Sequence, residues 1–231
     1  MSGSQRTIGQ SVAEGVGCIP GFVNSYTLED GEQVYLVDTG FSSKAKAIVR
    51  AFRTADVPLD RVKKILLTHR HPDHMGGAAY LHSGTGAVVE CQTEDAPYVD
   101  GRTKPPMSLL MRLFVRLHPV PVGVELKGGE IVGPLSVIFV PGHTAGEVAF
   151  YDSARKILFS GDSVVEHDGH LALPAPRYAT NVRQAVDSLN RLKALEIELL
   201  LPGHGQPVRK DVAGLLEELI RRAPATYLGR S

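Results

Sequence analysis

A cluster of candidate metal ligands lies in the stretch HRHPDH, residues 69–74, which follows an apolar run ending at Thr68. Imidazole nitrogens and carboxylate oxygens are donors that proteins use to hold zinc and related divalent metals. His69 and His71 are two residues apart, so both can point off the end of a strand toward one ion. Asp73 and His74 would lie on the first turn of a following helix, displaced toward a second ion. The stretch therefore predicts a two-metal scaffold.

Three further apolar runs end in a residue that can bind metal. SVIFVPGH ends at His143, KILFSGD ends at Asp162 and ELLLPGH ends at His204. Continuous apolar runs of this kind are typical of strands buried on both faces. Since sites in layered α/β proteins collect at the carboxyl ends of strands, we expect these three residues to meet the 69–74 cluster and complete two ligand sets.

Strand-like and helix-like runs alternate along the chain and must position these residues. The stretch FVNSYTLEDGEQVYLVDTG predicts a hairpin with its turn at Asp30-Gly31. Helices are expected at 42–55 and from Pro72 onward, and apolar residues at helical spacing predict two more helices over 181–195 and 212–223. The order favours an α/β fold. No low-complexity break interrupts it, so we expect a single domain over residues 1–231.

Composition excludes several classes of protein. The 231 residues include 25 basic and 25 acidic side chains, so nucleic acid is not an expected partner. No apolar stretch approaches the roughly 20 residues of a membrane span, and the N-terminus lacks a secretory core, which predicts a cytoplasmic protein. The two cysteines, Cys18 and Cys91, are far apart and are expected to be buried free thiols.

The motifs together resemble the metallo-β-lactamase superfamily, from VDTG at 37–40 through HRHPDH, PGHTAGE, SGD and PGHG at residue 204. The resemblance implies a four-layer αββα sandwich of two similar halves, with the metals at one edge of the sheets. It also implies that Asp162 bridges two ions and that Asp38 orients a histidine. Asp38 has a competing interpretation as a cap of the helix at Ser42. The implied ligands are His69, His71 and His143 for one ion, and Asp73, His74 and His204 for the other.

The ligand set and the resemblance indicate a hydrolase. Five imidazoles and two carboxylates without a thiolate favour two zinc ions, although iron, manganese and cobalt accept the same donors. Two cations roughly 3.5–4 Å apart hold a bridging hydroxide at neutral pH. Asp73 is the expected catalytic residue, because its second oxygen can orient that hydroxide. We expect cleavage of a carboxylic ester, thioester or lactone, as in the glyoxalase II-like and lactonase-like branches.

Other activities of similar proteins stay open as alternatives. One is a mononuclear iron oxidoreductase similar to persulfide dioxygenases, and less favoured ones are a phosphotriesterase and a β-lactamase. Zinc β-lactamases generally lack an aspartate at the position of Asp162, and lactonases commonly carry a tyrosine where this chain has Ser163 to Val165. A binding module without catalysis is disfavoured because no ligand is missing.

Contacts to a small-molecule substrate are expected from Tyr178 and His167, which also have an interpretation as ordinary loop residues. His82 and His118 are expected to be unrelated to the metals. The segment 101–122 is a candidate lid or insertion, because Met111 and Phe114 belong to an apolar stripe at helical spacing. The same stripe is compatible with core packing or with a homodimer contact.

Overall fold

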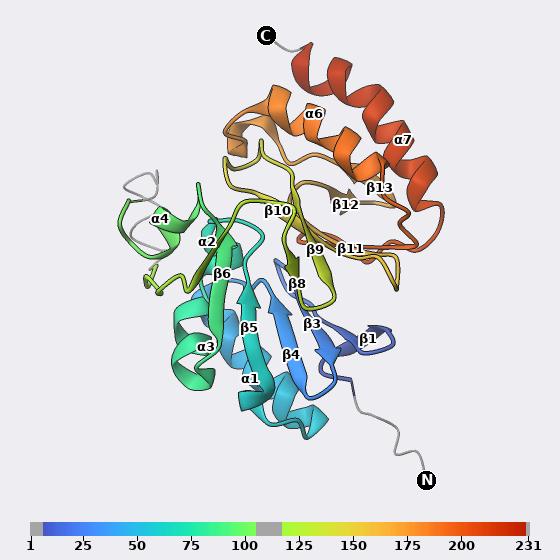
Figure 1. Cartoon of the computed structure of the whole chain (residues 1–231). Helices are drawn as coiled ribbons and strands as arrows, with labels where there is room; N and C mark the ends of the chain where they lie inside the picture. Colours follow the sequence, from blue (N-terminus) through green and yellow to red (C-terminus); the bar gives the residue numbers. More distant parts are fainter. Residues whose placement is uncertain (1–6, 105–116, 230–231) are drawn as a thin grey trace. The chain divides into compact units, whose positions relative to one another are not determined.

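The computed structural model describes residues 7–104 and 117–229 (Figure 1). The described residues form two compact units. The first contains residues 7–67, 71–90, 98–104 and 117–124, and the second contains residues 68–70, 91–97 and 125–229. Most of the candidate lid, including Met111 and Phe114, lies outside the described residues.

The first unit is organised around a mixed sheet. Among the described residues this sheet has seven strands in the order β1-β2-β3-β4-β5-β6-β7. Strands β1 to β4 pair antiparallel, whereas β4, β5 and β6 are parallel neighbours, so the carboxyl ends of these three strands lie at one edge. The strands are β1 (Gln10–Ala13), β2 (Val16–Ile19), β3 (Ser25–Asp30), β4 (Gln33–Val37), β5 (Val62–Leu66), β6 (Val88–Gln92) and β7 (Val124–Leu126).

Helices of the first unit lie beside strands β4 to β6 (Figure 1). The helix expected at 42–55 is confirmed as a 3-10 turn, η1 (Ser42–Lys44), followed by α1 (Ala45–Ala55). Ile48 and Phe52 of α1 are buried one turn apart, as an amphipathic helix requires. The remaining helices of this unit are η2 (Leu59–Arg61), α2 (Pro72–Met75) and α3 (Ala78–Thr85), and α4 (Ala96–Val99) begins in the second unit and ends in the first.

The hairpin of β3 and β4 is confirmed, but its turn lies one residue later than expected. Asp30 is the last residue of β3 and pairs with Gln33, so Gly31 and Glu32 form the turn. Gly31 has a φ of 59°, in the region where glycine is favoured. The prediction placed the turn at Asp30-Gly31 because that dipeptide is a strong turn signal, and it did not account for the pairing of Asp30.

The second unit contains a mixed sheet with five strands among the described residues, in the order β14-β11-β10-β9-β8. Strand β10 is antiparallel to both β9 and β11, and β11 is parallel to β14. The carboxyl ends of β9, β11 and β14 therefore lie at the same edge. The strands are β8 (Ile131–Val132), β9 (Leu135–Phe139), β10 (Val148–Asp152), β11 (Ile157–Gly161) and β14 (Leu199–Pro202).

The expectation of full burial holds for part of this sheet. Every residue of β11 and β14 is buried. In β9, however, Ile138 and Phe139 are half-buried, so that prediction was wrong for the carboxyl end of this strand. The exposed guanidinium of Arg191 lies over the Phe139 ring and explains how this apolar side chain is covered at the surface.

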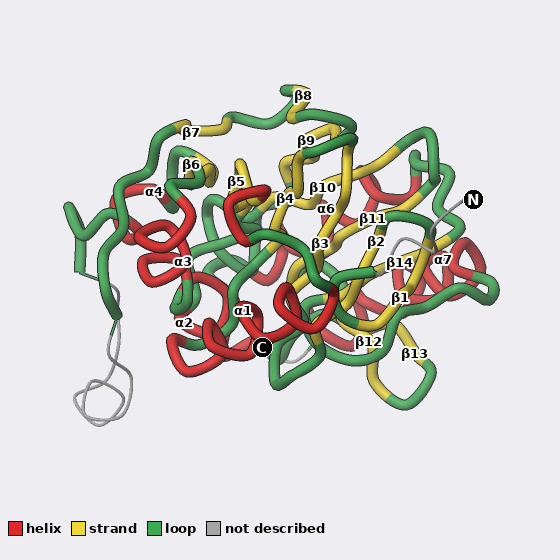
Figure 2. Tube along the Cα trace, turned by 90° about the horizontal axis from the view of Figure 1, so that it is seen from below, coloured by secondary structure: helices red, strands yellow, loops and turns green. Residues whose placement is uncertain are grey.

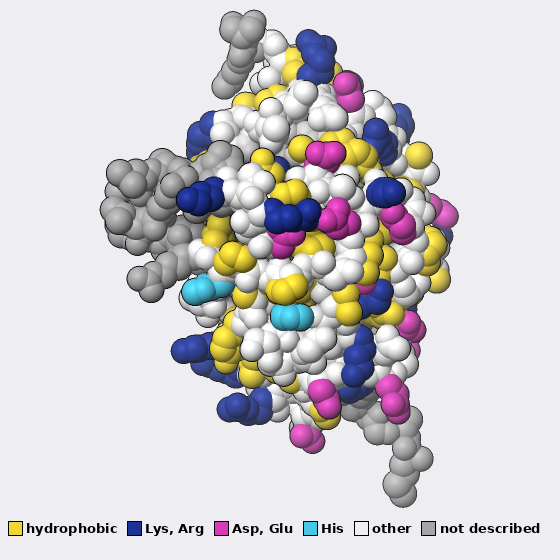
Figure 3. Space-filling view, turned by 60° about the vertical axis from the view of Figure 1, so that its left-hand side comes forward, with side chains coloured by type: hydrophobic (Ala, Val, Ile, Leu, Met, Phe, Trp, Pro, Cys, Tyr) yellow, Lys and Arg dark blue, Asp and Glu magenta, His cyan; other side chains and the backbone are white. Residues whose placement is uncertain are grey.

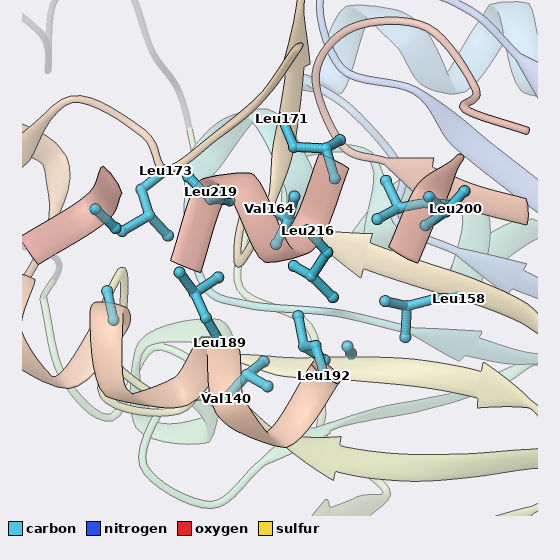
Figure 4. Packing of buried hydrophobic residues seen from close by; sticks show 14 of the residues in the cluster. Val140, Leu158, Val164, Leu171, Leu173, Leu189, Leu192, Leu200, Leu216 and Leu219 are labelled. Carbon is cyan, nitrogen blue, oxygen red and sulfur yellow. The ribbon is translucent and has the colours of Figure 1, made fainter. Parts of the chain in front are cut away.

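Two helices cover the second sheet, and both were expected from the apolar spacing of their sequences. These are α6 (Val182–Lys193) and α7 (Val212–Ala223), which contact each other and are followed by a π-helical turn, η4 (Pro224–Leu228). Leu189 and Leu192 of α6 pack with Leu216 and Leu219 of α7 in one buried cluster (Figure 4). Asn181 caps α6 by accepting a hydrogen bond from the Gln184 N–H.

A short ribbon of β12 (Val165–His167) and β13 (His170–Ala172) ends in a surface loop (Figure 2), and a 3-10 turn, η3 (Pro176–Tyr178), follows it. Basic and acidic side chains are interspersed on the face seen in Figure 3. Cys18 and Cys91 are buried free thiols, as expected. Among the helices described, none is long and apolar enough to cross a bilayer.

Candidate metal centre

Asp38 orients His74 within the first unit. Asp38 follows β4, adopts a left-handed φ of 54° and donates its N–H to the Leu66 carbonyl. Its Oδ2 lies 2.8 Å from His74 Nδ1, and both side chains are buried. If Nδ1–H donates to the carboxylate, Nε2 carries the lone pair that a metal needs. The competing interpretation of Asp38 as a cap was wrong, because the 3-10 turn at Ser42 begins after Phe41 with no side-chain cap.

The turn that carries HRHPDH is fixed by backbone contacts. His71 is extended and Pro72 begins α2, where a proline stabilises the first turn of a helix. Thr39 holds the end of this turn, because its N–H and its hydroxyl both donate to the His74 carbonyl at 2.7 Å. The short helix therefore places Asp73 and His74 on the turn directly after His71.

Three residues of the second unit meet where the strand directions predict. His143, Asp162 and His204 follow β9, β11 and β14, whose carboxyl ends share one edge of the sheet. Asp162 Oδ2 lies 3.4 Å from His143 Nε2 and 3.5 Å from His204 Nε2. His143 and Asp162 are buried, whereas the His204 side chain is 27% exposed. One carboxylate oxygen is thus within reach of two imidazoles.

Glu147 is a buried acid that the sequence reasoning missed. Its Oε1 accepts the Asp162 N–H at 3.0 Å and lies 3.9 Å from His69 Nδ1. Glu147 and His69 are both fully buried, and the Thr68 hydroxyl lies 3.1 Å from the same His69 nitrogen. Buried carboxylates beside imidazoles are an electrostatic setting that a divalent cation stabilises. Its position within PGHTAGE, four residues after His143, was the available signal.

Each of the seven predicted ligands belongs to at least one group of side chains that could hold a metal ion. Among the described residues there are three such groups, and within each group the ligand atoms all lie within 4.8 Å of one another. His69 and His74 each belong to two of these groups. The groups are His69 with His71 and His143, His69 with His74 and Asp162, and Asp73 with His74 and His204.

The two predicted substrate residues lie beside segments that carry ligands. Tyr178 is 56% exposed in η3, and two residues later Thr180 donates its N–H to the His143 carbonyl. His167 lies on the exposed β12–β13 ribbon, with Nδ1 2.9 Å from the Asp168 carboxylate. His82 Nδ1 lies 2.8 Å from the Ala87 carbonyl at the end of α3, and His82 belongs to none of the ligand groups.

Comparison with known proteins identifies similar chains. The profile of the metallo-β-lactamase superfamily matches residues 18–204. The probable metallo-hydrolase YybB of Bacillus subtilis (strain 168) is 27% identical over 186 residues, which cover 80% of this chain and 82% of that protein. A hydroxyacylglutathione hydrolase of Cereibacter sphaeroides (strain ATCC 17025 / ATH 2.4.3) is 34% identical over 146 residues, but the match covers 62% of this chain and 49% of that protein.

A solved structure, TTHA1623 in a di-iron-bound form, is 31% identical and superposes with a TM-score of 0.65. The superposition covers 84% of this chain and 91% of that one. The fold class expected from the sequence, an α/β fold of the metallo-β-lactamase type with two mixed sheets flanked by helices, is confirmed.

Proposed function

The chain belongs to the metallo-β-lactamase superfamily, and from this premise we propose that it is a metal-dependent hydrolase of a carboxylic ester, thioester or lactone. The observation that carries the proposal is that seven donor residues fall into three groups of three, and within each group the ligand atoms lie within 4.8 Å of one another. Such a concentration of imidazoles and carboxylates, largely buried, is typical of a metal centre and not of a solvated surface.

The donor set fits divalent metal ions. It combines imidazole nitrogens with carboxylate oxygens, and the two thiols of the chain, Cys18 and Cys91, belong to none of the groups found among the described residues. Zinc suits this mixture, and iron and manganese accept it too. We propose two zinc ions. The di-iron form of TTHA1623 makes iron the first competitor.

Two ligand sets are proposed. His69, His71 and His143 would hold one ion, and this trio coincides with one of the three groups. The proposed second set coincides with another group and consists of Asp73, His74 and His204. Asp162 would serve both ions, because its Oδ2 lies within 3.5 Å of an imidazole from each set.

The protein residues around the ions would prepare them for hydrolysis. Two ions bound in this way supply an activated water and a Lewis acid for the acyl carbonyl. Asp38 keeps His74 in the tautomer that presents Nε2, through the contact of 2.8 Å at Nδ1. Asp73 would act as the catalytic residue by accepting a hydrogen bond from the attacking water and orienting it. Glu147 holds the Asp162 backbone in place through its hydrogen bond.

An ester, thioester or lactone is proposed as substrate because each offers the activated water an electrophilic acyl carbon. The hydroxyacylglutathione hydrolase of Cereibacter sphaeroides supports a thioester as one member of this class, although the chain spans about half the length of that protein. Tyr178 is the proposed substrate contact on the His143 side, since the loop that follows it is bonded to the His143 carbonyl. His167 is the proposed contact on the ribbon that begins beside His204, whose carbonyl accepts the Glu166 N–H.

The test combines elemental analysis with a substrate panel. We expect about two zinc ions per chain and turnover of an aryl ester, an acyl-glutathione thioester or an acyl-homoserine lactone. A phosphotriester and a β-lactam complete the panel. Iron at about one ion per chain, with oxygen uptake and no hydrolysis, would instead support a mononuclear iron oxidoreductase.

A pair of variants separates metal chemistry from folding. Asp162→Ala should abolish turnover and reduce bound metal, while the circular dichroism spectrum stays unchanged, because β11 is buried by its apolar residues. His82→Ala, whose imidazole contacts the Ala87 carbonyl, should keep full activity. Activity retained in Asp162→Ala would refute the assignment of that carboxylate to both ions.

A further inference from the structure

Asp95 is a fully buried carboxylate with no role in the ligand sets proposed above. It lies three residues after the end of β6, in a turn closed by the bond from its N–H to the Gln92 carbonyl. Among the described residues, four hydrogen bonds reach its side chain, and all four partners are donors. They are Arg70 N–H at 3.0 Å, Arg70 Nη1 at 2.7 Å, Thr144 Oγ1 at 2.6 Å and Gly146 N–H at 3.2 Å.

The donors come from two segments that carry proposed ligands. Arg70 lies between His69 and His71, and it bonds Asp95 through both its backbone and its guanidinium. Thr144 directly follows His143, and Gly146 lies two residues further on. One carboxylate therefore joins the backbone that carries His69 and His71 to the backbone that carries His143.

Gly146 shows how closely these segments pack. A Cβ atom at this position would lie 2.6 Å from Gln92 Oε1 and 2.7 Å from Asp95 N, closer than real Cβ atoms approach such groups. Only glycine allows the loop after His143 to rest on the turn that contains Asp95. Two features thus maintain this contact: the four hydrogen bonds to the Asp95 carboxylate, and the close approach that glycine allows at position 146.

The ion pair inside this contact is well shielded from water. Asp95 is fully buried, and the Arg70 side chain is 10% exposed. A buried carboxylate and guanidinium at 2.7 Å keep a fixed geometry, because separating them would leave a charge in a medium that cannot solvate it. Such a pair holds backbone segments at a defined separation, which is the requirement for a preformed metal site.

We propose that Asp95 is a positioning residue for one metal ion, the one assigned to His69, His71 and His143. The inference rests on the proposed function, because it uses the proposed ligand sets. In this proposal, Asp95 positions the three histidines of one set. The other set contains His74, which a different carboxylate, Asp38, orients. Loss of Asp95 should therefore weaken the binding of the two ions unequally.

Asp95→Asn is the sharpest variant. An amide offers one acceptor oxygen where the four donors now meet two, so at least one segment loses its bond while the side-chain volume is kept. Removing a hydrogen-bonding partner behind metal ligands typically lowers affinity by about 10- to 100-fold. We expect that loss for one of the two stepwise dissociation constants, and a change of less than about 3-fold for the other.

Asp152→Asn provides a matched control. Asp152 is also fully buried, also pairs with an arginine, Arg155, at 2.6 Å, and also accepts backbone N–H groups. It is the last residue of β10, which runs opposite to β9 and β11, so it lies at the sheet edge away from His143 and Asp162. This control should lose stability without any change in either metal constant.

The experiment is a titration of the metal-free full-length chain with Zn²⁺ in the presence of a competing chelator, repeated with Co²⁺ to follow its visible absorption. The expected result is unequal weakening in Asp95→Asn and an altered Co²⁺ spectrum, with neither change in Asp152→Asn. Equal weakening of both constants, or unchanged constants with lower stability, would overturn the assignment.

A second variant covers the case in which Asp95→Asn does not fold. Thr144→Val removes the single hydroxyl bonded to Asp95 and keeps the shape of a side chain that is fully buried. It should weaken the same constant by a smaller factor, and two unchanged constants would contradict the inference. A wild-type chain that binds neither metal would overturn the proposed function and this inference with it, whereas two bound ions with indifferent variants would overturn only the role of Asp95.

Discussion

Replacement of Asp38 tests whether a buried carboxylate tunes the proposed ligand His74. The Asp38 Oδ2 and His74 Nδ1 atoms are 2.8 Å apart, and neither side chain is more than 3% exposed. A carboxylate that accepts Nδ1–H makes Nε2 a better donor to a metal, and its loss typically costs about 10- to 100-fold in affinity. Asparagine still offers an acceptor oxygen to Nδ1–H, so we expect Asp38→Asn to lose about 10-fold, or about 1.4 kcal/mol.

Asp38→Ala should lose more, because alanine offers no acceptor. We expect about 100-fold, or about 2.7 kcal/mol. The backbone at position 38 has a left-handed φ of 54°, which raises the free energy of the folded state with alanine there, whereas asparagine largely avoids this strain. Stability of the metal-free chain must therefore be measured alongside the metal affinity, by urea denaturation, so that strain is separated from ligand tuning.

The assay is competition for Zn²⁺ between the chain and a chelator, with Asp56→Asn as control. Asp56 also has a left-handed φ, 58°, at the end of α1, but its exposed side chain belongs to none of the ligand groups. Asp56→Asn should leave both constants unchanged. Equal affinities in the wild type, Asp38→Asn and Asp38→Ala would refute the reasoning that links this carboxylate to the metal.

Two further predictions concern the framework around the site. Burial lowers the pKa of Lys44 to about 8, whereas an unfolded lysine stays near 10.5, so the unfolded chain binds more protons between these values. Relative to Lys44→Met, the free energy of unfolding of the wild type, measured by urea denaturation, should rise with pH in that window. The same pH dependence in the wild type and in Lys44→Met would contradict this expectation. Leu189→Ala should cost about 2–5 kcal/mol by leaving a cavity in the cluster beneath α6 and α7, without changing metal affinity; Leu215→Ala, at a half-buried position, should cost less.

The groups of candidate ligands could be predicted because their sequence signals are local. Each ligand follows an apolar run by a few residues, and strand direction brings the ends of such runs together. His69 to His74 even lie on a single turn, so their proximity needs no knowledge of the fold. The amphipathic helices α6 and α7 were equally visible, because their apolar residues recur at helical spacing.

Glu147 and Asp95 were not predictable in the same way, because their partners are distant in sequence. Asp95 is one of two adjacent acids in QTEDAP, and its contacts lie 25, 49 and 51 residues away. Nothing in the local spacing distinguishes it from Glu94. Likewise, the turn of the β3–β4 hairpin was misplaced because the pairing of Asp30 with Gln33 depends on the register of these two strands.

The parallel strands of the first sheet explain the positions of the Asp38 and Asp95 carboxylates. β4, β5 and β6 are parallel neighbours, so Asp38, the HRHPDH turn and the turn that contains Asp95 all follow carboxyl ends at one edge. The central strand delivers four proposed ligands, and its two neighbours each deliver a buried aspartate that contacts this turn, Asp38 at His74 and Asp95 at Arg70. A side chain that only orients ligands must contact the turn but need not contact the metal. The flanking strands place their aspartates where they can make this contact with the turn. If this division is correct, Asp38→Asn and Asp95→Asn should weaken different ions, and a double variant should show independent losses that add in free energy.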